Sequence, residues 1–395
     1  MNKKNFRSFD TIASLSSGMT NTLRDLLGLS LVIISYAWLK DHLALFEIQS
    51  KFWIYFLCFI GLDFAQYWSH RWNHIINVFW NRHIVHHSSE EFNLACALRQ
   101  PVSDIVGVYF FLYIPIAIIG VPAEVVAVIA PIHLFAQFWY HTKLINKLGF
   151  LEHVLVTPSH HRVHHAINDI YLDKNYAAIF IIWDKWFGTF QTELAETTPV
   201  YGVKRPVKTW NPLVINYQHF WSLLQDAWRT ESWKDKIRIW FMPTGWRPQD
   251  VQNTFPIESI IDVYAMRKYD SNESNALAIW SWFQLIISLL FMYHLLSQFA
   301  SFSLREILFY GIFLYLTIFS FTSLMDNHKV TLPVEILRFA FGISIIYTTL
   351  GWFHLEEIIP DASKLISIYL LISILITFYF LLNLRKTNEQ LIYSS

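Results

Sequence analysis

Runs of apolar residues alternate with polar stretches along the whole chain. Eight apolar runs lie at about 28–46, 52–69, 105–120, 122–140, 276–299, 305–325, 335–353 and 364–384. A helix needs about 20 predominantly apolar residues to cross the hydrocarbon core of a bilayer. The pattern therefore predicts an all-α, polytopic membrane protein with about eight membrane helices.

The third and fourth runs are separated only by the segment Gly120-Val-Pro122, and the third run is short. Glycine and proline interrupt helices. We therefore expect these two runs to form a tight helical hairpin that need not cross the bilayer fully.

Composition supports the membrane interpretation. Of the 395 residues, 54% are hydrophobic and 15% are charged, and the mean hydropathy is +0.33, which is too apolar for an ordinary soluble domain. The formal net charge is +0, so no overall attraction favours nucleic acid as a partner. Two cysteines, Cys58 and Cys96, are too few for a disulfide framework or a thiolate metal site. The polar N-terminus lacks the pattern of a cleaved signal peptide, so the first apolar run is expected to remain as an anchor.

Two polar stretches, 70–104 and 141–275, interrupt the apolar pattern. If every apolar run crosses, both stretches lie on the side that carries most of the lysines and arginines, which is the cytoplasmic side. The second stretch contains Trp210, Trp221, Trp228, Trp233, Trp240 and Trp246. Such a sequence fits helices lying in the headgroup region, and it fits ordinary packing of a cytoplasmic cap equally well.

Histidines concentrate in one part of the chain. Of the 17 histidines, 12 fall between residues 70 and 165, where an even spread would place about four. They form one HxxxH motif and two HxxHH motifs: His70 to His74, His83 to His87 and His161 to His165. On a helix, residues three and four apart lie on one face, so each motif presents several imidazoles in one direction.

Imidazole suits iron, zinc, copper and nickel, and the lack of nearby cysteine argues against a thiolate site. Eight or more nitrogen ligands exceed what one ion holds, so the count predicts two metal ions. His141 is added to the predicted ligands because it lies at the end of an apolar run. The predicted ligands are His70, His74, His83, His86, His87, His141, His161, His164 and His165.

Three further polar residues are candidates for supporting the ligands. Asp63 lies in an apolar run, seven residues before His70, and a carboxylate there needs a partner. It is expected to accept a hydrogen bond from a ligand imidazole or to pair with Arg71. Gln137, four residues before His141, and His160, beside the last motif, are expected in similar supporting positions.

The motifs resemble those of the fatty acid hydroxylase / sterol desaturase superfamily, whose members carry HxxxH, HxxHH and HxxHH boxes. Their surroundings are most similar to the alkylglycerol monooxygenases. The similar segments are 63–71, 86–100, 137–142, 157–165, 173–176 and 183–190, and similarity extends to 245–248 and the C-terminal apolar runs. Asn175 lies in one of these segments and joins the supporting candidates. Ile75 departs from the pattern, because the alkylglycerol monooxygenases commonly have a glutamate there.

The resemblance implies a membrane-bound di-iron monooxygenase with two Fe ions, O2 and a lipid substrate, acting by hydroxylation of an alkylglycerol-type ether lipid. It implies an electron donor, either a redox protein or a reduced pterin such as tetrahydrobiopterin. It places the histidines in a helical cap on the cytosolic face of a bacterial inner membrane or the endoplasmic reticulum. Two alternatives stay open: a sterol or fatty-acyl hydroxylase or desaturase on the same site, and a membrane metal-binding protein without redox chemistry.

Four regions follow from these observations. An N-terminal segment with the first membrane helix covers 1–51, and the histidine-box core covers 52–190. A Trp-rich cytosolic or interfacial segment covers 191–275. The last region, 276–395, carries C-terminal membrane helices without a histidine box.

Overall fold

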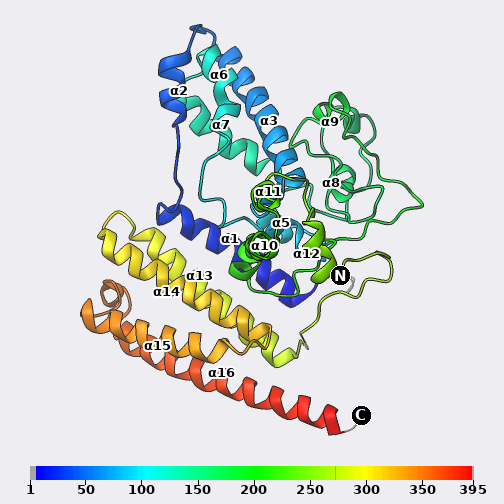
Figure 1. Ribbon diagram of the computed structural model, residues 1–395. Coiled ribbons are helices and arrows are strands. Elements are labelled where there is room, and N and C mark those ends of the chain that lie inside the picture. Colours follow the sequence, from blue (N-terminus) through cyan, green and yellow to red (C-terminus); the bar gives the residue numbers. More distant parts are fainter. Residues whose placement is uncertain (1–5, 272, 394–395) are drawn as a thin grey trace. The chain divides into compact units, whose positions relative to one another are not determined.

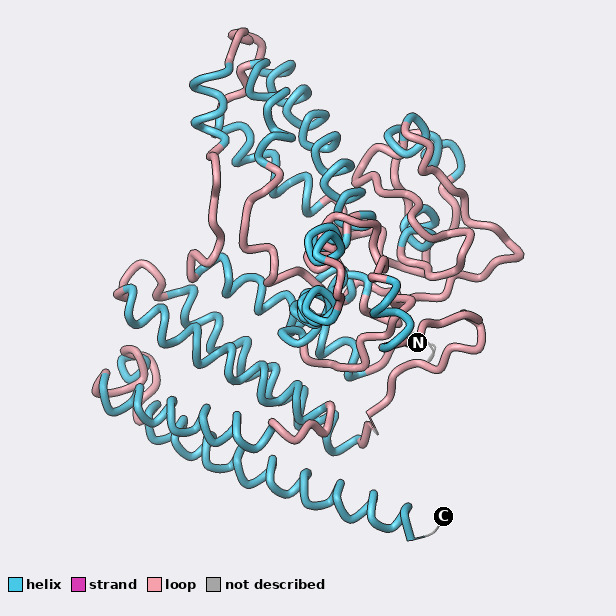
Figure 2. Tube along the Cα trace, in the orientation of Figure 1, coloured by secondary structure: helices cyan, strands magenta, loops and turns pink. Residues whose placement is uncertain are grey.

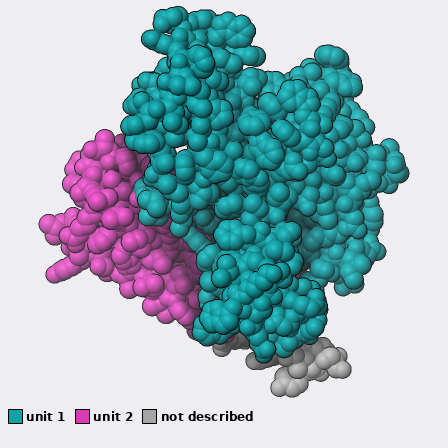
Figure 3. Space-filling model, turned by 45° about the horizontal axis from the view of Figure 1, so that its top comes forward, with its two compact units in different colours: residues 1–6, 28–207, 215–268 teal, residues 7–27, 208–214, 269–395 magenta. Residues whose placement is uncertain are grey.

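The computed structural model describes residues 6–271 and 273–393. Within this part of the chain the fold is helical, with no β-strand and only three isolated bridges (Figures 1 and 2). The chain divides into two compact units, which Figure 3 colours separately. Unit 1 holds 28–207 and 215–268, and unit 2 holds 7–27, 208–214 and the described chain from 269 onward.

Unit 1 contains short helices joined by long irregular segments, and its two longest helices are α3 and α10. Its elements are α2 (Tyr36–Leu43), α3 (Lys51–Ile75), α4 (Asn77–Trp80), α5 (Ile84–His87), η2 (Cys96–Leu98), η3 (Phe110–Tyr113), α6 (Ile114–Ile119), α7 (Ala123–Phe135), η4 (Gly149–His153), α8 (Pro158–His164), α9 (Ile182–Trp186), most of α10 (Pro212–Arg229), α11 (Trp233–Arg238) and α12 (Gln249–Thr254).

Helices α2, α3, α6 and α7 form a small apolar bundle at one end of unit 1 (Figure 1). Cys58 and Leu62 of α3 pack against Ile116 of α6 and Ile129 of α7. Gly120 ends α6 with a positive φ of 85°, and a Cβ there would lie 2.1 Å from the carbonyl oxygen of Phe46. The close turn between α6 and α7 therefore requires glycine.

The eight expected membrane helices are reduced to four candidate spans in the described residues, and all four belong to unit 2. Run 28–46 contains only the eight-residue helix α2, because the residues before it pair with a distant segment: the backbone of Leu31 hydrogen-bonds to Ile105 and Gly107. Runs 105–120 and 122–140 form helices too short to cross a bilayer alone, as the hairpin expectation allowed. Run 52–69 lies in α3, whose second half is polar.

Unit 2 contains α1 (Ser8–Leu26), α13 (Asn275–Ser297), α14 (Leu304–Met325), α15 (Thr331–Thr348), η5 (Leu355–Glu357) and α16 (Ala362–Tyr393). The four C-terminal apolar runs are confirmed as helices of 18 residues or more, long enough for a hydrocarbon core of about 30 Å. Consecutive helices α13 to α16 pack against one another, and α1 packs on α13 and α14. Ser303, the N-cap residue of α14, forms a capping box with Glu306.

Candidate metal centre

The nine predicted ligands come together in unit 1 as two neighbouring groups. Within each group the candidate ligand atoms lie within 4.8 Å of one another. The first group is His70, His74, His83, His87 and His164. The second group is His86, His141, His161 and His165. The sequence thus identified every histidine of both groups.

Each HxxHH motif is divided between the two groups. In α5 and its N-cap, His83 and His87 belong to the first group, whereas His86 belongs to the second. In α8 and its C-cap, His164 belongs to the first group, and the second holds His161 and His165. In both motifs, residues i and i+4 share one group and residue i+3 belongs to the other.

Backbone carbonyls fix the orientation of four imidazoles. The Nδ1 atoms of His70 and His164 lie 2.7 and 3.0 Å from the carbonyl oxygens of Tyr176 and Lys174. Those of His86 and His141 lie 3.3 and 3.2 Å from the carbonyls of Arg99 and Gln137. Because a carbonyl only accepts, Nδ1 carries the proton in each ring. The lone pair of Nε2 then points into the group, as in metal-binding histidines.

The spacing of the Nε2 atoms fits a shared ion. In the second group, the Nε2 of His161 lies 2.8 Å from that of His141 and 3.0 Å from that of His165. In the first group, those of His70 and His83 are 2.9 Å apart. Metal–nitrogen bonds of about 2.1 Å put adjacent octahedral ligands about 3 Å apart.

Unpaired buried nitrogens give an independent test of fit. The Nε2 atoms of His74, His87 and His164 are buried without a hydrogen-bond partner. All three belong to the first group. A buried polar atom without a partner costs about 1–3 kcal/mol, and coordination of a cation would remove that cost. The donor set therefore fits an imidazole-bound metal pair.

Burial keeps the imidazoles in the neutral form that metals require. Six of the nine are between 3% and 8% exposed. Burial, followed by repulsion from neighbouring imidazoles, holds the pKa of His87 and His165 well below the usual value. The same two causes lower the pKa of His161 and His164. Neutral imidazoles bind a metal without first having to release a proton.

A tight loop after α8 supplies two of the orienting carbonyls. Asp173 and Asn175 both adopt left-handed conformations, with φ of 57° and 56°, which Asp and Asn tolerate better than most residues. The Asn175 side chain donates to the carbonyls of His160 and Gln191. Buried Asp184 accepts from the backbone N–H groups of residues 176 and 177 at 2.8 Å. Asn175 thus supports the ligands through the loop and does not contact them directly.

Asp63 has partners other than the expected ones. Its Oδ1 accepts from His133 Nε2 at 2.8 Å and from Ile179 N at 2.9 Å. Its Oδ2 accepts from Phe180 N at 3.1 Å and Trp183 Nε1 at 2.8 Å. The carboxylate is 0% exposed. Neither a ligand imidazole nor Arg71 is among these partners: His133 of α7 is the imidazole that binds Asp63, and Arg71 donates to the Tyr67 hydroxyl and the Phe187 carbonyl.

Gln137 connects this carboxylate to the second group. Its Nε2 lies 3.2 Å from both Nδ1 and the carbonyl oxygen of His133. Its own backbone carbonyl accepts from His141 Nδ1. The expected support of His141 therefore comes from the main chain of Gln137, while its side chain binds His133.

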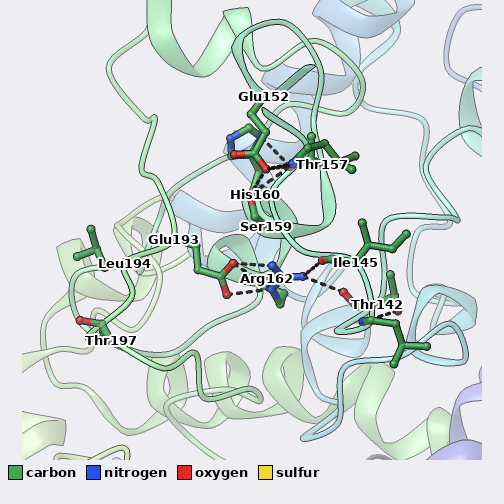
Figure 4. A network of polar contacts seen from close by, with 12 residues as sticks. Thr142, Ile145, Glu152, Thr157, Ser159, His160, Arg162, Glu193, Leu194 and Thr197 are labelled. Atoms are coloured by element: carbon green, nitrogen blue, oxygen red, sulfur yellow. Dashed lines mark hydrogen bonds and ion pairs between the residues drawn. The ribbon is translucent and has the colours of Figure 1, made fainter. Parts of the chain in front are cut away.

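A polar network around α8 holds the second group from outside (Figure 4). Arg162 donates to Glu193 and to the carbonyls of Thr142 and Ile145, just after His141. Glu152 accepts from Thr157 and Ser159 at the start of the helix. His160 belongs to neither group; its Nδ1 lies 3.4 Å from Thr157 Oγ1, and burial lowers its pKa to about 4.

A cavity of about 600 Å³ in unit 1 borders the first group. His74, His87 and His164 of the first group line one wall, together with His165 of the second group. Apolar and polar side chains share the other walls, among them Trp80, Leu223, Trp246, Arg205, Asp226 and Arg247. Volumes of about 300–1,000 Å³ are typical of small-molecule sites, so the histidines have an adjoining space for a reactant.

Sequence reasoning missed two supporting residues. His133 lacks a motif, but its position four residues before Gln137 on an apolar helix was a usable signal. Asp184 was recognised only as part of a similar segment. A carboxylate between Trp183 and Trp186 could have been suspected of binding backbone N–H groups, as it does.

Comparison with known proteins agrees with this geometry. The sequence model of the family described as fatty acid hydroxylase matches residues 55–189, which include all nine histidines. No solved structure matches the chain.

Three curated relatives share one name, alkylglycerol monooxygenase. The human protein is 34% identical over 384 residues, covering 96% of this chain and 84% of the relative. The Xenopus tropicalis protein is 36% identical over 290 residues, covering 72% of this chain and 64% of the relative. The Danio rerio protein is 40% identical over 240 residues, covering 60% and 53%. The chain belongs to the fatty acid hydroxylase superfamily, in the family of the alkylglycerol monooxygenases.

Proposed function

We propose that this chain is a membrane-bound di-iron monooxygenase that hydroxylates an ether lipid of the alkylglycerol type. The observation that carries the proposal is the pair of converging imidazole groups beside a cavity. The family supports an oxidoreductase acting on a lipid. The name of the relatives supports the ether-lipid substrate.

The nine histidines of the two groups would hold two Fe ions through neutral imidazole nitrogens. Bound iron would supply the activation of O2 and the oxidation of an unactivated C–H bond. In the overall reaction, one oxygen atom enters the carbon next to the ether oxygen. The other leaves as water after uptake of two electrons and two protons. The resulting hemiacetal breaks down to an aldehyde and a free glycerol hydroxyl.

The chain's own contribution is orientation and exclusion of water. The carbonyls of Tyr176, Lys174, Arg99 and Gln137 hold four imidazoles in one tautomer. The cavity offers about 600 Å³, which suits the polar end of a lipid better than a whole long-chain molecule. We place the ether bond of the substrate beside His74, His87 and His164.

For the electron donor we propose two chemical classes. A reduced pterin such as tetrahydrobiopterin, or a redox protein, would supply two electrons. Ile75, at the position where the family commonly has glutamate, packs against the apolar cluster of Tyr67, Tyr140 and Ile181. This residue offers a pterin no polar contact, so a pterin would have to be bound by other groups. We propose the cytosolic face for the histidine groups.

Metal analysis tests the proposal first. The full chain, purified from iron-replete cells, should contain two irons, and His86→Ala and His164→Ala should each contain less. His42→Ala is the matched control, because His42 is exposed and belongs to neither group. Wild-type iron content in both site variants would contradict the assignment of the groups.

Turnover separates the proposed substrate from its alternatives. Incubation of membranes with an alkylglycerol, O2 and a reduced pterin should release a long-chain aldehyde. Lipid-dependent O2 uptake without aldehyde would favour a sterol or fatty-acyl hydroxylase or desaturase on the same site. An iron-loaded protein that consumes no O2 with any lipid would favour a metal-binding protein.

A further inference from the structure

Helix α10 has two opposite faces with different surroundings. Gln218, His219, Ser222, Leu223 and Asp226 line the cavity beside the first histidine group. Tyr217, Phe220, Trp221, Leu224 and Trp228 are exposed instead. At 3.6 residues per turn, the centres of these two sets lie about 180° apart around the helix. One helix therefore separates the cavity from an outer surface made of aromatic and apolar side chains.

The exposed face is large and continues into the next helix. Trp221 is 60% exposed and Trp228 is 86% exposed. In α11 and the residues after it, Trp233, Ile237 and Phe241 follow one another at intervals of four residues and are 68% or more exposed. Single exposed apolar residues are ordinary, but so many on two consecutive helices mark an interaction surface. We call these residues of α10 and α11 the aromatic face; both helices are green in Figure 1.

Basic residues accompany the aromatic face. The Lys236 ammonium donates to the carbonyls of Ala227 and Trp228 at 3.0 and 3.1 Å, at the end of α10. The same ammonium lies 5.6 Å from the centre of the Trp233 ring. Exposed Arg229 and Lys234 lie in the same turn region. Tryptophan beside lysine and arginine is the composition of the headgroup layer of membranes, where the indole is half in hydrocarbon and the cation meets lipid phosphates.

We infer that the aromatic face of α10 and α11 lies in the headgroup layer of the bilayer. The chain carries four candidate membrane spans, so a lipid surface is available to the rest of the chain at all times. A lipid surface accounts for both the aromatic residues and the cations. The occupant is thus the phospholipid interface.

The arrangement puts the cavity just beneath the lipid headgroups. An α-helix with its side chains is about 10 Å across, so the cavity lies about one helix diameter from the lipid. The position of the cavity does not depend on the proposed function, but the following statement about the substrate does. A lipid that enters past α10 would bring a bond near its polar end to the first histidine group.

Site-directed spin labelling tests the inference without relying on turnover. Cys58 and Cys96 are buried, so single cysteines at Trp221→Cys and Trp228→Cys can be labelled selectively in the full chain. Glu196→Cys is the matched control, an exposed position in a polar segment of unit 1. The labelled proteins are placed in nanodiscs of phosphatidylcholine and phosphatidylglycerol. Relaxation by lipid-soluble O2 is compared with relaxation by a water-soluble nickel chelate.

We expect labels at 221 and 228 to gain relaxation by O2 and to lose most relaxation by the nickel chelate, relative to the label at 196. Nickel relaxation equal to that at 196 would show a face in water and overturn the inference. Shielding from both reagents would show a protein partner or a second copy and would overturn it as well. All three positions are exposed, so the substitutions should leave the fold intact. Because the readout is structural, its failure is distinct from failure of the proposed reaction.

Discussion

Replacement of Asp63 by asparagine tests how the buried carboxylate of α3 holds the centre together. The side chain accepts four hydrogen bonds, two on each oxygen. Asp63→Asn preserves shape and one acceptor oxygen. Its amide nitrogen would face two N–H donors, whichever way the amide is turned. At least two buried donors therefore lose their acceptor.

The cost follows from that count. A buried donor without an acceptor costs about 1–3 kcal/mol, so two cost about 2–6 kcal/mol. In a domain of 150–250 residues, about 1 kcal/mol of unfolding free energy lowers the melting temperature by about 2–4 °C. A loss of about 4 kcal/mol thus lowers it by about 8–16 °C. Metal retention should fall too, because residues 179 and 180 follow the loop that orients His70.

Melting of the purified chain in detergent, followed by size-exclusion chromatography, measures the effect. Trp183→Phe alone removes one donor and leaves the carboxylate satisfied by the other three. If the amide nitrogen of the Asp63→Asn side chain takes the place of Oδ2, the same change in that background removes a donor that lacks an acceptor. The double variant is then more stable than the sum of the single losses predicts, by about 1–3 kcal/mol, whereas the two losses add if the nitrogen takes the place of Oδ1. A loss below about 1 kcal/mol for Asp63→Asn would refute this account.

Three other substitutions probe separate features. Burial lowers the pKa of His219 to about 4, below the ordinary value of about 6.5. The stability that the neutral imidazole contributes is therefore complete above the unfolded pKa and is lost as the pH drops from about 6.5 towards 4. His219→Gln should reduce this loss in a series of melting temperatures measured against pH. Glu335→Gln removes the carboxylate that lies 2.6 Å from the buried Arg338 of α15, and it should lower the free energy of unfolding by about 3–5 kcal/mol. The double variant Glu335→Gln, Arg338→Met should recover part of that stability. If it recovers none, the ion pair is not the cause of the loss. Asn175→Ala removes the side-chain hydrogen bonds of a residue whose φ is 56°, a conformation that alanine tolerates poorly. Retention of iron against a chelator should therefore fall about 10–100-fold. Asn175→Gly should lose less, because glycine adopts this conformation freely.

The sequence predicted which histidines come together, because their signal is local. Spacings of three and four in HxxxH and HxxHH identify residues that a single helical turn brings together. The C-terminal membrane helices were predictable for the same reason, since length and apolar composition suffice. All nine histidines and all four of these helices are found where the pattern placed them.

Features that depend on contacts between distant segments were not predictable. The seven-residue spacing of Asp63 and His70 places them on one helix face, but the partner of Asp63 is decided by α7 and by residues 179–183. The run 28–46 is apolar enough to suggest a membrane helix, yet only 36–43 are helical, since Leu31 pairs through its backbone with Ile105 and Gly107. In both cases the deciding residues lie outside the pattern from which the expectation was drawn.

The division of each HxxHH motif shows why the centre needs so much support around it. A helix of one or two turns, such as α5 or α8, has little stability of its own, and here each contributes ligands to two groups at once. A small rotation of α8 would move His161 and His164 in different directions and spoil both groups. The Arg162–Glu193 pair and the Asp184-bound loop, whose Lys174 carbonyl binds His164, both resist that rotation. Precision at the centre therefore comes from ordered loops and buried charges around short helices, rather than from the helices that carry the motifs.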